Sequence, residues 1–396
     1  MITTAPISRK TLRAGTGLSR EADAHTAGRE AATAAIAPLA GEAPALVVVF
    51  TTPRYDLAQL LAGVRSVTGA AQLVGATGSG EIVQGSYLGM GAGVGVLALS
   101  AGPYRFGIGS GSHLRGNLPG AGQSIAEAAR DRVGASPHAA ALLLADSLLG
   151  DLQQFVQGVY RISGPRVPIV GAGAGDEQKF IRTLVFHDDA VVEEGAVVLW
   201  IASPHPLQVI TRHGWEPIGV PMIVTRVAGT EIVELGGRAA AEAYEEQIGL
   251  APGQLRAEDF WGTSILHPFG LIQPDGTTVI RVARAKTPQG TLRIQGCVPP
   301  TGSAVQVMSG SADALMAVAD EVITAAVAAR PGAGAVLAFS CAARAMIFKS
   351  RVEEEPRRMQ AAAGAVPTFG FHCCAEFARS AGVLGTHNAT LTALAL

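Results

Sequence analysis

The chain reads Thr368-Phe-Gly-Phe-His-Cys-Cys-Ala-Glu-Phe377 near its C-terminus, and two earlier stretches follow the same plan. They are Leu73-Val-Gly-Ala-Thr-Gly-Ser-Gly-Glu-Ile82 and Pro168-Ile-Val-Gly-Ala-Gly-Ala-Gly-Asp-Glu177. Each begins with apolar residues, followed by a glycine, small residues and then an acidic residue. Six positions separate glycine from acid in every copy: Gly75 to Glu81, Gly171 to Glu177 and Gly370 to Glu376. The chain therefore contains an internal repeat, and this repeat decides the fold.

The same order of elements surrounds each copy. In the first unit, apolar residues at helical spacing predict a helix over 21–39, and the nearly continuous apolar run over 45–50 is typical of a strand covered on both faces. The unit is completed by a helix over 57–67, a strand over 71–74 and a closing strand over 93–100. The order recurs over 124–201 and 313–396, which predicts stacked or pseudo-symmetric sheets. We expect an α/β fold whose mixed β-sheets are built from repeated helix-strand units flanked by helices.

The sequence between the second and third units has a different character. Residues 264–309 alternate short β-favouring runs with turn signals such as Pro274-Asp-Gly276, which predicts an antiparallel meander in a second domain. A length of 396 residues suits two domains. We expect a flexible leader over 1–20, a first domain over 21–228 and a second over 229–396.

Composition excludes several functional classes. With 48% hydrophobic and 16% charged residues, the chain is globular rather than disordered. The 30 basic and 32 acidic residues nearly cancel, which argues against a nucleic-acid surface. No apolar run approaches the roughly 20 residues of a membrane span. Four cysteines are too few for a disulfide framework and suit a reducing compartment, so we expect a cytoplasmic protein.

Cofactor and metal signals are both weak. In Gly171-Ala-Gly-Ala-Gly-Asp176 an aspartate stands where a dinucleotide fingerprint needs its third glycine, and the next segment resembles a strand. Tight turns and close strand packing explain these glycines better. Cys373 and Cys374 are adjacent, so on a strand they would point to opposite faces and could hardly share one ion. We therefore expect no cofactor and no metal.

A candidate ligand site lies at the ends of two strands of the third unit. Arg344 follows the strand over 335–340, and Glu376 follows the strand over 366–369. If these strands are parallel neighbours, both side chains emerge at the carboxyl edge, where open α/β sheets bind ligands. The Arg fork suits a carboxylate and the Glu an ammonium, so the pair would fit a zwitterion. The alternative is a salt bridge between the two.

Other candidate residues lie nearby. Those expected to contact a ligand with Arg344 and Glu376 are Gly370, His372, His387, Asn388, Cys341 and His267. His267 alternatively caps a turn. A second reading makes the protein a hydrolase or transferase for a small acyl or amide substrate, with Cys373 or Cys374 as nucleophile and His372 or His387 as base. Buried structural thiols, or an interaction scaffold without a ligand, are the remaining alternatives.

The chain resembles the FIST family over about residues 20–396. The resemblance is carried by the three repeated stretches, His267-Pro-Phe-Gly270, Phe339-Ser-Cys-Ala-Ala-Arg344 and His387-Asn-Ala-Thr390. Where the family usually has Gly-Phe-Tyr-Thr-x-Gly-Glu, this chain has Gly370-Phe-His-Cys-Cys-Ala-Glu376. The resemblance implies a sensory module that binds small molecules such as amino acids. Because no signalling domain is recognisable here, a separate signalling protein and a second copy of the chain are the candidate protein partners.

Overall fold

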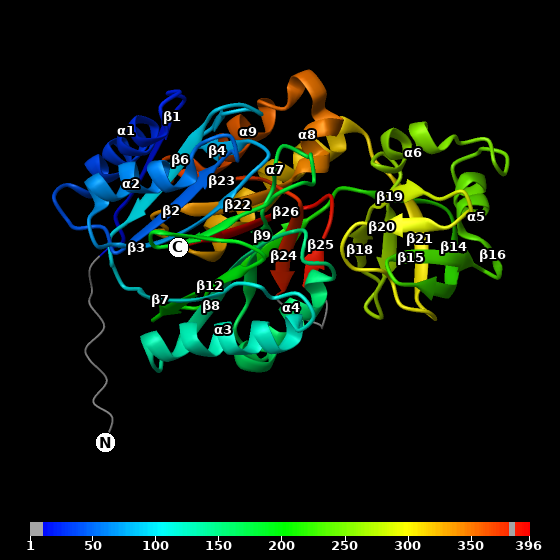
Figure 1. The fold of residues 1–396 in the computed structure, drawn as a ribbon, viewed down its shortest axis with the longest axis horizontal. Coiled ribbons are helices and arrows are strands. Elements are labelled where there is room, and N and C mark those ends of the chain that lie inside the picture. The colour runs from blue at the N-terminus through cyan, green and yellow to red at the C-terminus, as the bar shows by residue number, and fades with distance from the viewer. Residues whose placement is uncertain (1–10, 380–384) are drawn as a thin grey trace.

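Three helix-strand repeats form one body, and an antiparallel insert projects from the third repeat (Figure 1). The computed structural model describes residues 11–379 and 385–396. The first repeat contains β1 (Ala14–Ser19), α1 (Ala24–Ile36), a short 3-10 turn (Ala37–Leu39), β2 (Leu46–Thr51), α2 (Leu57–Thr68), β3 (Gln72–Thr77), β4 (Glu81–Val83), β5 (Ser86–Tyr87) and β6 (Val94–Leu99).

The second and third repeats have the same order. The second contains β7 (Arg105–Gly111), α3 (Leu118–Val133), β8 (His138–Ala145), α4 (Leu152–Ser163), β9 (Ile169–Gly173), β10 (Val185–His187), β11 (Ala190–Val192) and β12 (Ala196–Ser203). The third contains β13 (Val209–Arg212), α7 (Ala312–Ala329), β22 (Val336–Cys341), α8 (Ala342–Phe348), a 3-10 turn (Lys349–Arg351), α9 (Glu354–Ala363), β23 (Thr368–Cys373), β24 (Ala375–Arg379), β25 (Thr386–His387) and β26 (Leu391–Ala395). The expected repeated units and the α/β class are confirmed.

The repeats exchange hairpins. Each of the three six-stranded sheets has a parallel pair at its centre, β2 with β3, β8 with β9, or β22 with β23. A closing strand of the same repeat lies antiparallel on one side. On the other side lies a hairpin from a different repeat: β10–β11 joins the first sheet, β24–β25 the second and β4–β5 the third. The body is therefore a cyclic, pseudo-threefold arrangement in which every repeat completes the sheet of another.

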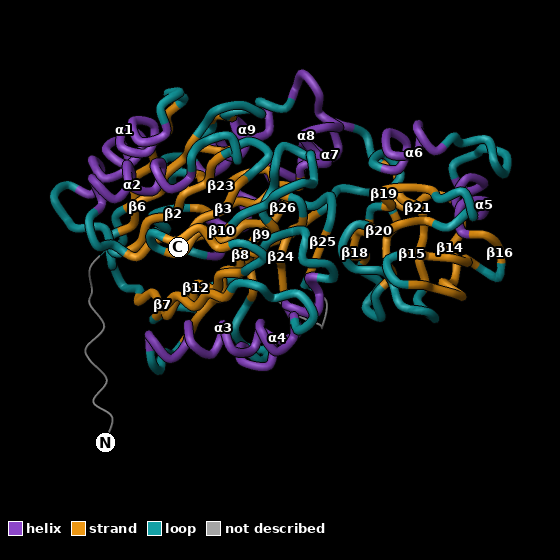
Figure 2. The backbone as a smooth tube through the Cα atoms, viewed as in Figure 1, coloured by secondary structure: helices purple, strands orange, loops and turns teal. Residues whose placement is uncertain are grey.

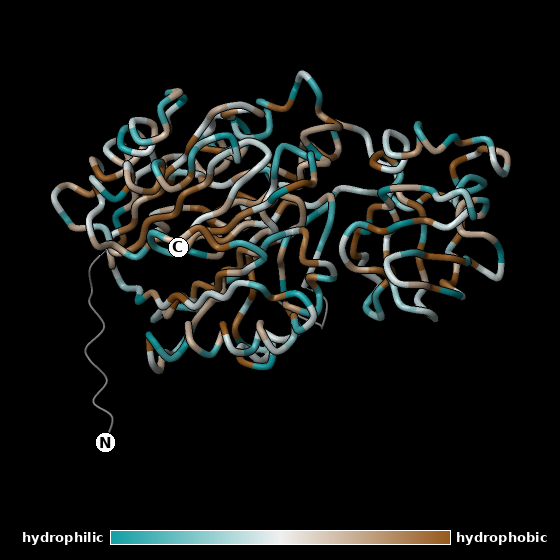
Figure 3. The backbone as a smooth tube through the Cα atoms, in the orientation of Figure 1, coloured by the Kyte–Doolittle hydropathy of each residue, from teal (hydrophilic) through white to brown (hydrophobic). Residues whose placement is uncertain are grey.

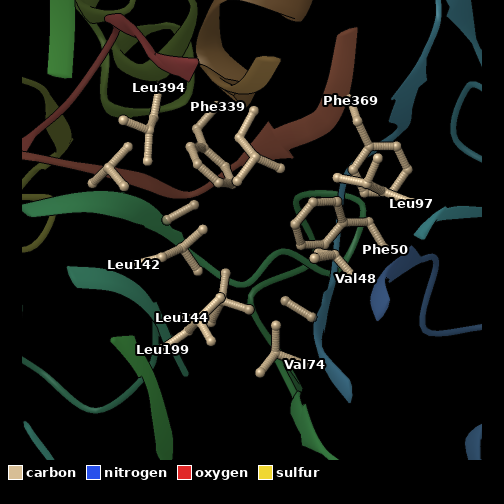
Figure 4. Packing of buried hydrophobic residues seen from close by; sticks show 14 of the residues in the cluster. Val48, Phe50, Val74, Leu97, Leu142, Leu144, Leu199, Phe339, Phe369 and Leu394 are labelled. Atoms are coloured by element: carbon tan, nitrogen blue, oxygen red, sulfur yellow. The ribbon is translucent and has the colours of Figure 1, made fainter. Parts of the chain in front are cut away.

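The strands are continuously apolar because both faces are covered. In β2 all six residues are buried. Val47 and Val49 pack towards α1 and α2, whereas Val48 and Phe50 enter a central core shared by all three sheets (Figure 4). There the ring of Phe50 lies 4.4 Å from that of Phe371. Figures 2 and 3 show the resulting layers, with hydrophobic strands inside and helices outside.

The insert comprises residues 216–309, and the antiparallel strands expected over 264–309 are confirmed as part of it. Its elements are β14 (Glu216–Ala228), β15 (Glu231–Leu235), β16 (Arg238–Ala239), α5 (Ala240–Gln247), α6 (Ala257–Ser264), β17 (Phe269–Ile272), β18 (Thr278–Arg281), β19 (Ala283–Lys286), β20 (Leu292–Ile294) and β21 (Ala304–Ser309). The strands expected over 264–309 share one sheet with β14 and β15, in the order β18-β17-β21-β14-β15-β20-β19. It enters between β13 and α7, within the third repeat. A boundary between 228 and 229 falls between β14 and β15, inside this sheet.

The expected flexible leader is wrong in part. Residues 14–19 form β1, which pairs along its whole length with β6. Gly15 and Gly17 lie on the face of β1 that packs against α1. A side chain would not fit there, because a Cβ at Gly17 would come within 2.0 Å of Ala31 O. The rest of the expected leader, residues 1–10, lies outside the described residues. Among the residues that are described, no helix is both long enough and apolar enough to cross a membrane.

Candidate functional site

The three repeated stretches meet at the centre of the body. Immediately after β3, β9 and β23, the backbone of each stretch donates a hydrogen bond to another stretch, closing a ring. The three bonds run from Gly175 N to Thr77 O (2.7 Å), from Ser79 N to His372 O (2.9 Å) and from Cys374 N to Gly173 O (3.1 Å). The acids of the repeats are all buried around this ring: Glu81, Asp176, Glu177 and Glu376. The sequence repeat thus places its polar residues together in space.

Arg344 lies at the predicted edge but has a different partner. β22 and β23 are parallel neighbours, as expected. The Arg344 guanidinium is fully buried and contacts Glu355 of α9, with Nε and NH2 at 2.9 and 2.7 Å from Oε1. NH2 also donates to Leu315 O of α7. The sequence predicts that Arg344 and Glu376 face one hollow with complementary charges. This prediction is wrong for Arg344, because its guanidinium pairs with Glu355, eleven residues further along the chain.

His372 belongs to the same buried network. Its Nε2 lies 3.0 Å from Glu355 Oε2, which also accepts a hydrogen bond from Ser340 Oγ at 2.9 Å. Burial alone would raise the pKa of Glu355, but the Arg344 guanidinium and the His372 ring lower that pKa to about 2. Neighbouring residues of a strand point to opposite faces, so His372 faces the helices while Cys373 faces the body interior. The ring is not positioned as a base for Cys373.

Glu376 is held by the closing strand and a thiol. Its Oε2 accepts hydrogen bonds from Thr390 N and Oγ1 at 3.1 and 2.8 Å, and Cys373 Sγ lies 3.3 Å from Oε1. Burial raises the pKa of Glu376 to about 7, although the Thr390 bonds act in the opposite direction. The equivalent acid of the first repeat is Glu81, whose side-chain oxygens have no hydrogen-bond partner among the described residues. Burial raises the pKa of Glu81 well above the ordinary value.

A small cavity of about 30 Å³ lies beside these residues, where the body meets the insert. That space holds one or two water molecules, so a larger occupant requires side chains to move. The candidate residues that line it are Cys341, Cys373, Cys374 and Asn388. The other lining residues are Ala342, Ala343 and Met346 of α8, Gln178 and Phe180 after β9, and Trp261, Val282 and Gln295 of the insert. Neither Arg344, His372 nor Glu376 lines it.

The loop after β9 forms part of the cavity wall, which the sequence did not predict. The Asp176 carboxylate organises it by accepting hydrogen bonds from the backbone N–H groups of Phe180, Ile181 and Arg182, at 2.8, 2.6 and 3.0 Å. Glu177, Gln178 and Phe180 all have positive φ, between 55° and 65°. Non-glycine residues rarely adopt this conformation, and such strain is concentrated at functional sites. Only the acid after the glycine cluster signalled this loop in the sequence.

The remaining candidates have structural contacts. His387 Nε2 lies 2.9 Å from Ala378 O, and burial lowers the pKa of its ring to about 4. Asn388 Oδ1 lies 3.5 Å from Val282 N and so links the body to the insert. His267 sits in the turn after α6, where its backbone N–H donates to Ser264 O. A Cβ on Gly370 would come within 1.6 Å of Ala338 O. Of these, only Asn388 lines the cavity.

We expect the cavity thiols to be unreactive at neutral pH. Burial raises the pKa of Cys341 and Cys373 well above the ordinary value and that of Cys374 to about 12, so almost no thiolate is present. Iodoacetamide followed by peptide mass spectrometry should leave all three unmodified in the native protein and modify them after denaturation in urea. Stoichiometric labelling of one native thiol at pH 7 would contradict this and favour the covalent enzyme reading.

Three hairpin-exchanging repeats, an inserted antiparallel sheet and a cavity at their junction define a two-part α/β protein with an internal site. Two family models match the chain, and the boundary between them lies inside the insert. The FIST N domain matches residues 45–238 and the FIST C domain matches residues 240–379. The chain belongs to the FIST family, whose domains are associated with signal transduction and small-ligand sensing.

Similar proteins occur in bacteria and an archaeon. The chain is 27% identical over 388 residues to the uncharacterized protein Rv0628c of Mycobacterium tuberculosis, covering 96% of this chain and 98% of the relative. It is 27% identical over 392 residues to the uncharacterized protein Mb0898c of Mycobacterium bovis, covering 96% and 97%. A shorter match, 25% over 125 residues, links it to the uncharacterized protein MJ1623 of Methanocaldococcus jannaschii and covers 28% and 24%.

Proposed function

We propose that this FIST protein is a cytoplasmic sensor that binds a small molecule in the cavity between the body and the insert. The observation that carries the proposal is the composition of the cavity wall. Three amide side chains, Gln178, Gln295 and Asn388, interrupt a lining of thiols, alanines and aromatic rings. A few convergent polar groups in an otherwise apolar enclosure are typical of ligand sites. Amino acids and similar small zwitterions are the ligand class we favour.

The position of the cavity suggests how binding would be reported. Contacts that join the two parts beside the cavity include the Asn388–Val282 hydrogen bond and the Arg281–Thr386 hydrogen bond. In addition, the Arg284 guanidinium lies 3.7 Å from the centre of the Phe180 ring. An occupant larger than the present space must separate these contacts or shift the insert. A ligand that binds the shifted arrangement better changes its population, and a separate signalling protein or a second copy of the chain would recognise the change.

Calorimetric titration with the twenty amino acids tests this function. We expect saturable heat with at least one amino acid and about fivefold weaker binding by Asn388→Ala, since one hydrogen bond is worth about 1 kcal/mol. Trp261→Ala should weaken binding further by removing an aromatic wall. Gln289→Ala, on an exposed turn of the insert, is the matched control and should bind like the wild type. The proposal would be overturned if none of the twenty amino acids gave saturable heat, or if both cavity variants bound with unchanged affinity.

A further inference from the structure

A second site is indicated by Arg281, at the end of β18, where the insert meets the body. Its side chain is fully buried. One nitrogen, NH1, donates to the backbone oxygens of Ile280 and Thr386, both at 2.9 Å. Both acceptors are neutral. A guanidinium cannot lose its proton in a protein, so it carries a full positive charge into this interior.

The remaining donors of this cluster have no acceptor. Within residues 11–379 and 385–396, Arg281 Nε and NH2 are buried without a hydrogen-bond partner, and so is the Thr386 hydroxyl. The Thr386 carbonyl already contacts NH1, so these groups are neighbours. Leaving a buried charge without a counter-ion is strongly destabilising. Within the described residues no acidic side chain bonds to this charge, so an anion bound there would meet unpaired donors.

Among residues 11–379 and 385–396, no carboxylate forms a hydrogen bond with Arg281 Nε or NH2. Burial raises the pKa of the Cys297 thiol, while Arg281 lowers it and Asp151 raises it, so both charges lie near this sulfur. Asp151, however, caps α4 by accepting a hydrogen bond from Gln153 N at 3.0 Å. Neither the thiol nor Asp151 gives Arg281 Nε or NH2 a hydrogen bond of normal geometry, so both nitrogens stay without an acceptor in the described chain.

The two unpaired nitrogens of Arg281, Nε and NH2, form an edge with a defined shape. Elsewhere in this protein the same two nitrogens hold a carboxylate side-on: Arg54 Nε and NH2 lie 2.6 and 2.9 Å from the two oxygens of Glu177. Arg351 holds Glu354 in the same manner, with both distances 2.9 Å. This two-donor edge matches a planar carboxylate better than a single point of charge.

We propose that Arg281 and Thr386 form a binding site for the carboxylate group of a small molecule. The guanidinium edge takes both carboxylate oxygens, and the Thr386 hydroxyl donates a third hydrogen bond. The site is distinct from the cavity, which neither residue lines. Their near neighbours in the chain, Val282 and Asn388, do line the cavity and contact each other. The carboxylate site therefore borders the ligand cavity but does not depend on its proposed occupant.

The test is thermal unfolding of the full-length protein at constant ionic strength, with chloride replaced by formate, acetate, phosphate or sulfate. We expect formate or acetate to raise the unfolding midpoint saturably, because a ligand that binds only the folded state stabilises it by mass action. Arg281→Met should abolish this rise, and Arg281→Lys should reduce it because Lys lacks the two-donor edge. The matched control Arg256→Met, at an arginine of the insert whose side chain is 67% exposed, should keep it.

Three results would overturn the proposal. They are a wild type without a saturable response to any carboxylate, an equal response in Arg281→Met, and a phosphate or sulfate response that exceeds the carboxylate response. Should Arg281→Met fail to fold, Thr386→Val removes only the hydroxyl donor and is expected to shift the acetate titration to higher concentration. Asn388→Ala should leave the acetate response intact, which separates failure of this site from failure of the cavity.

Discussion

Glu355→Ala is expected to lower the free energy of unfolding by about 3–5 kcal/mol, the usual result of removing one partner of a buried ion pair. The Glu355 carboxylate joins Arg344, His372 and Ser340, and none of the charged groups reaches solvent. Alanine would leave the Arg344 charge buried among apolar residues. Urea unfolding monitored by circular dichroism measures the loss.

Two controls test whether the loss of stability in Glu355→Ala comes from the broken buried ion pair. The exposed pair Arg357–Glu353 on α9 has the i, i+4 spacing, so Glu353→Ala should cost less than about 1 kcal/mol. Replacing both partners of the buried pair, as Arg344→Met with Glu355→Leu, should recover most of the lost stability, because no charge then remains uncompensated. A Glu355→Ala protein within 1 kcal/mol of the wild type would show that water reaches the network.

Gly370→Ala is expected to be the most disruptive single methyl addition in the third repeat. The new Cβ would lie 1.6 Å from Ala338 O and 2.7 Å from Ala338 C, on the paired strand β22. Backbone cannot rotate away as a side chain can, so β22 and β23 would have to separate. We expect a loss of about 3 kcal/mol or more, at the upper end for overpacked cores, measured by urea unfolding.

Gly262→Ala is the matched control for this methyl group. Gly262 lies within α6, has no positive φ, and no atom stands within 4 Å of its absent Cβ. Alanine there should stabilise the protein by about 0.4–1 kcal/mol, because it restricts the unfolded chain and favours the helix. Equal stabilities of the two variants would mean that the β22–β23 pairing tolerates a wider spacing.

The repeats could be predicted from the sequence because burial and local chemistry act together there. Apolar runs such as β2 require cover on both faces, and the aspartates that begin helices, Asp23, Asp56 and Asp151, each accept a backbone N–H bond. The exchange of hairpins could not be predicted. Strands as short as β4 and β10 have three residues each, and tertiary contacts alone choose their partners.

The six-residue offset could be read from the sequence, because it marks structurally equivalent positions. Gly75 pairs with Val49, Gly171 with Leu143 and Gly370 with Ala338, and all three partners face the helices. The residue two positions after each glycine then supplies a carbonyl to the central ring of hydrogen bonds. Alternation along the strand therefore turns His372 towards the helices and Cys373 towards the interior.

The site was only partly predictable from the sequence. Arg344 was placed correctly at the carboxyl edge, but its partner Glu355 ends the run Glu353-Glu-Glu355, which resembles a solvated helix face in the sequence. Nothing in the sequence singled out Arg281 as a site residue, because a basic residue on a strand is usually exposed to solvent. Its significance comes from burial without an acid, which only three-dimensional packing creates.

The exchanged hairpins make the body an interlocked unit. A fragment ending between the two family-matched segments, near residue 239, would retain β4–β5 without the strand they join and β9 without β24. Such a fragment exposes unsatisfied edges on two sheets at once, the condition that promotes aggregation. We therefore expect the two family-matched halves not to fold as separate modules, and the three repeats to unfold together in one cooperative transition.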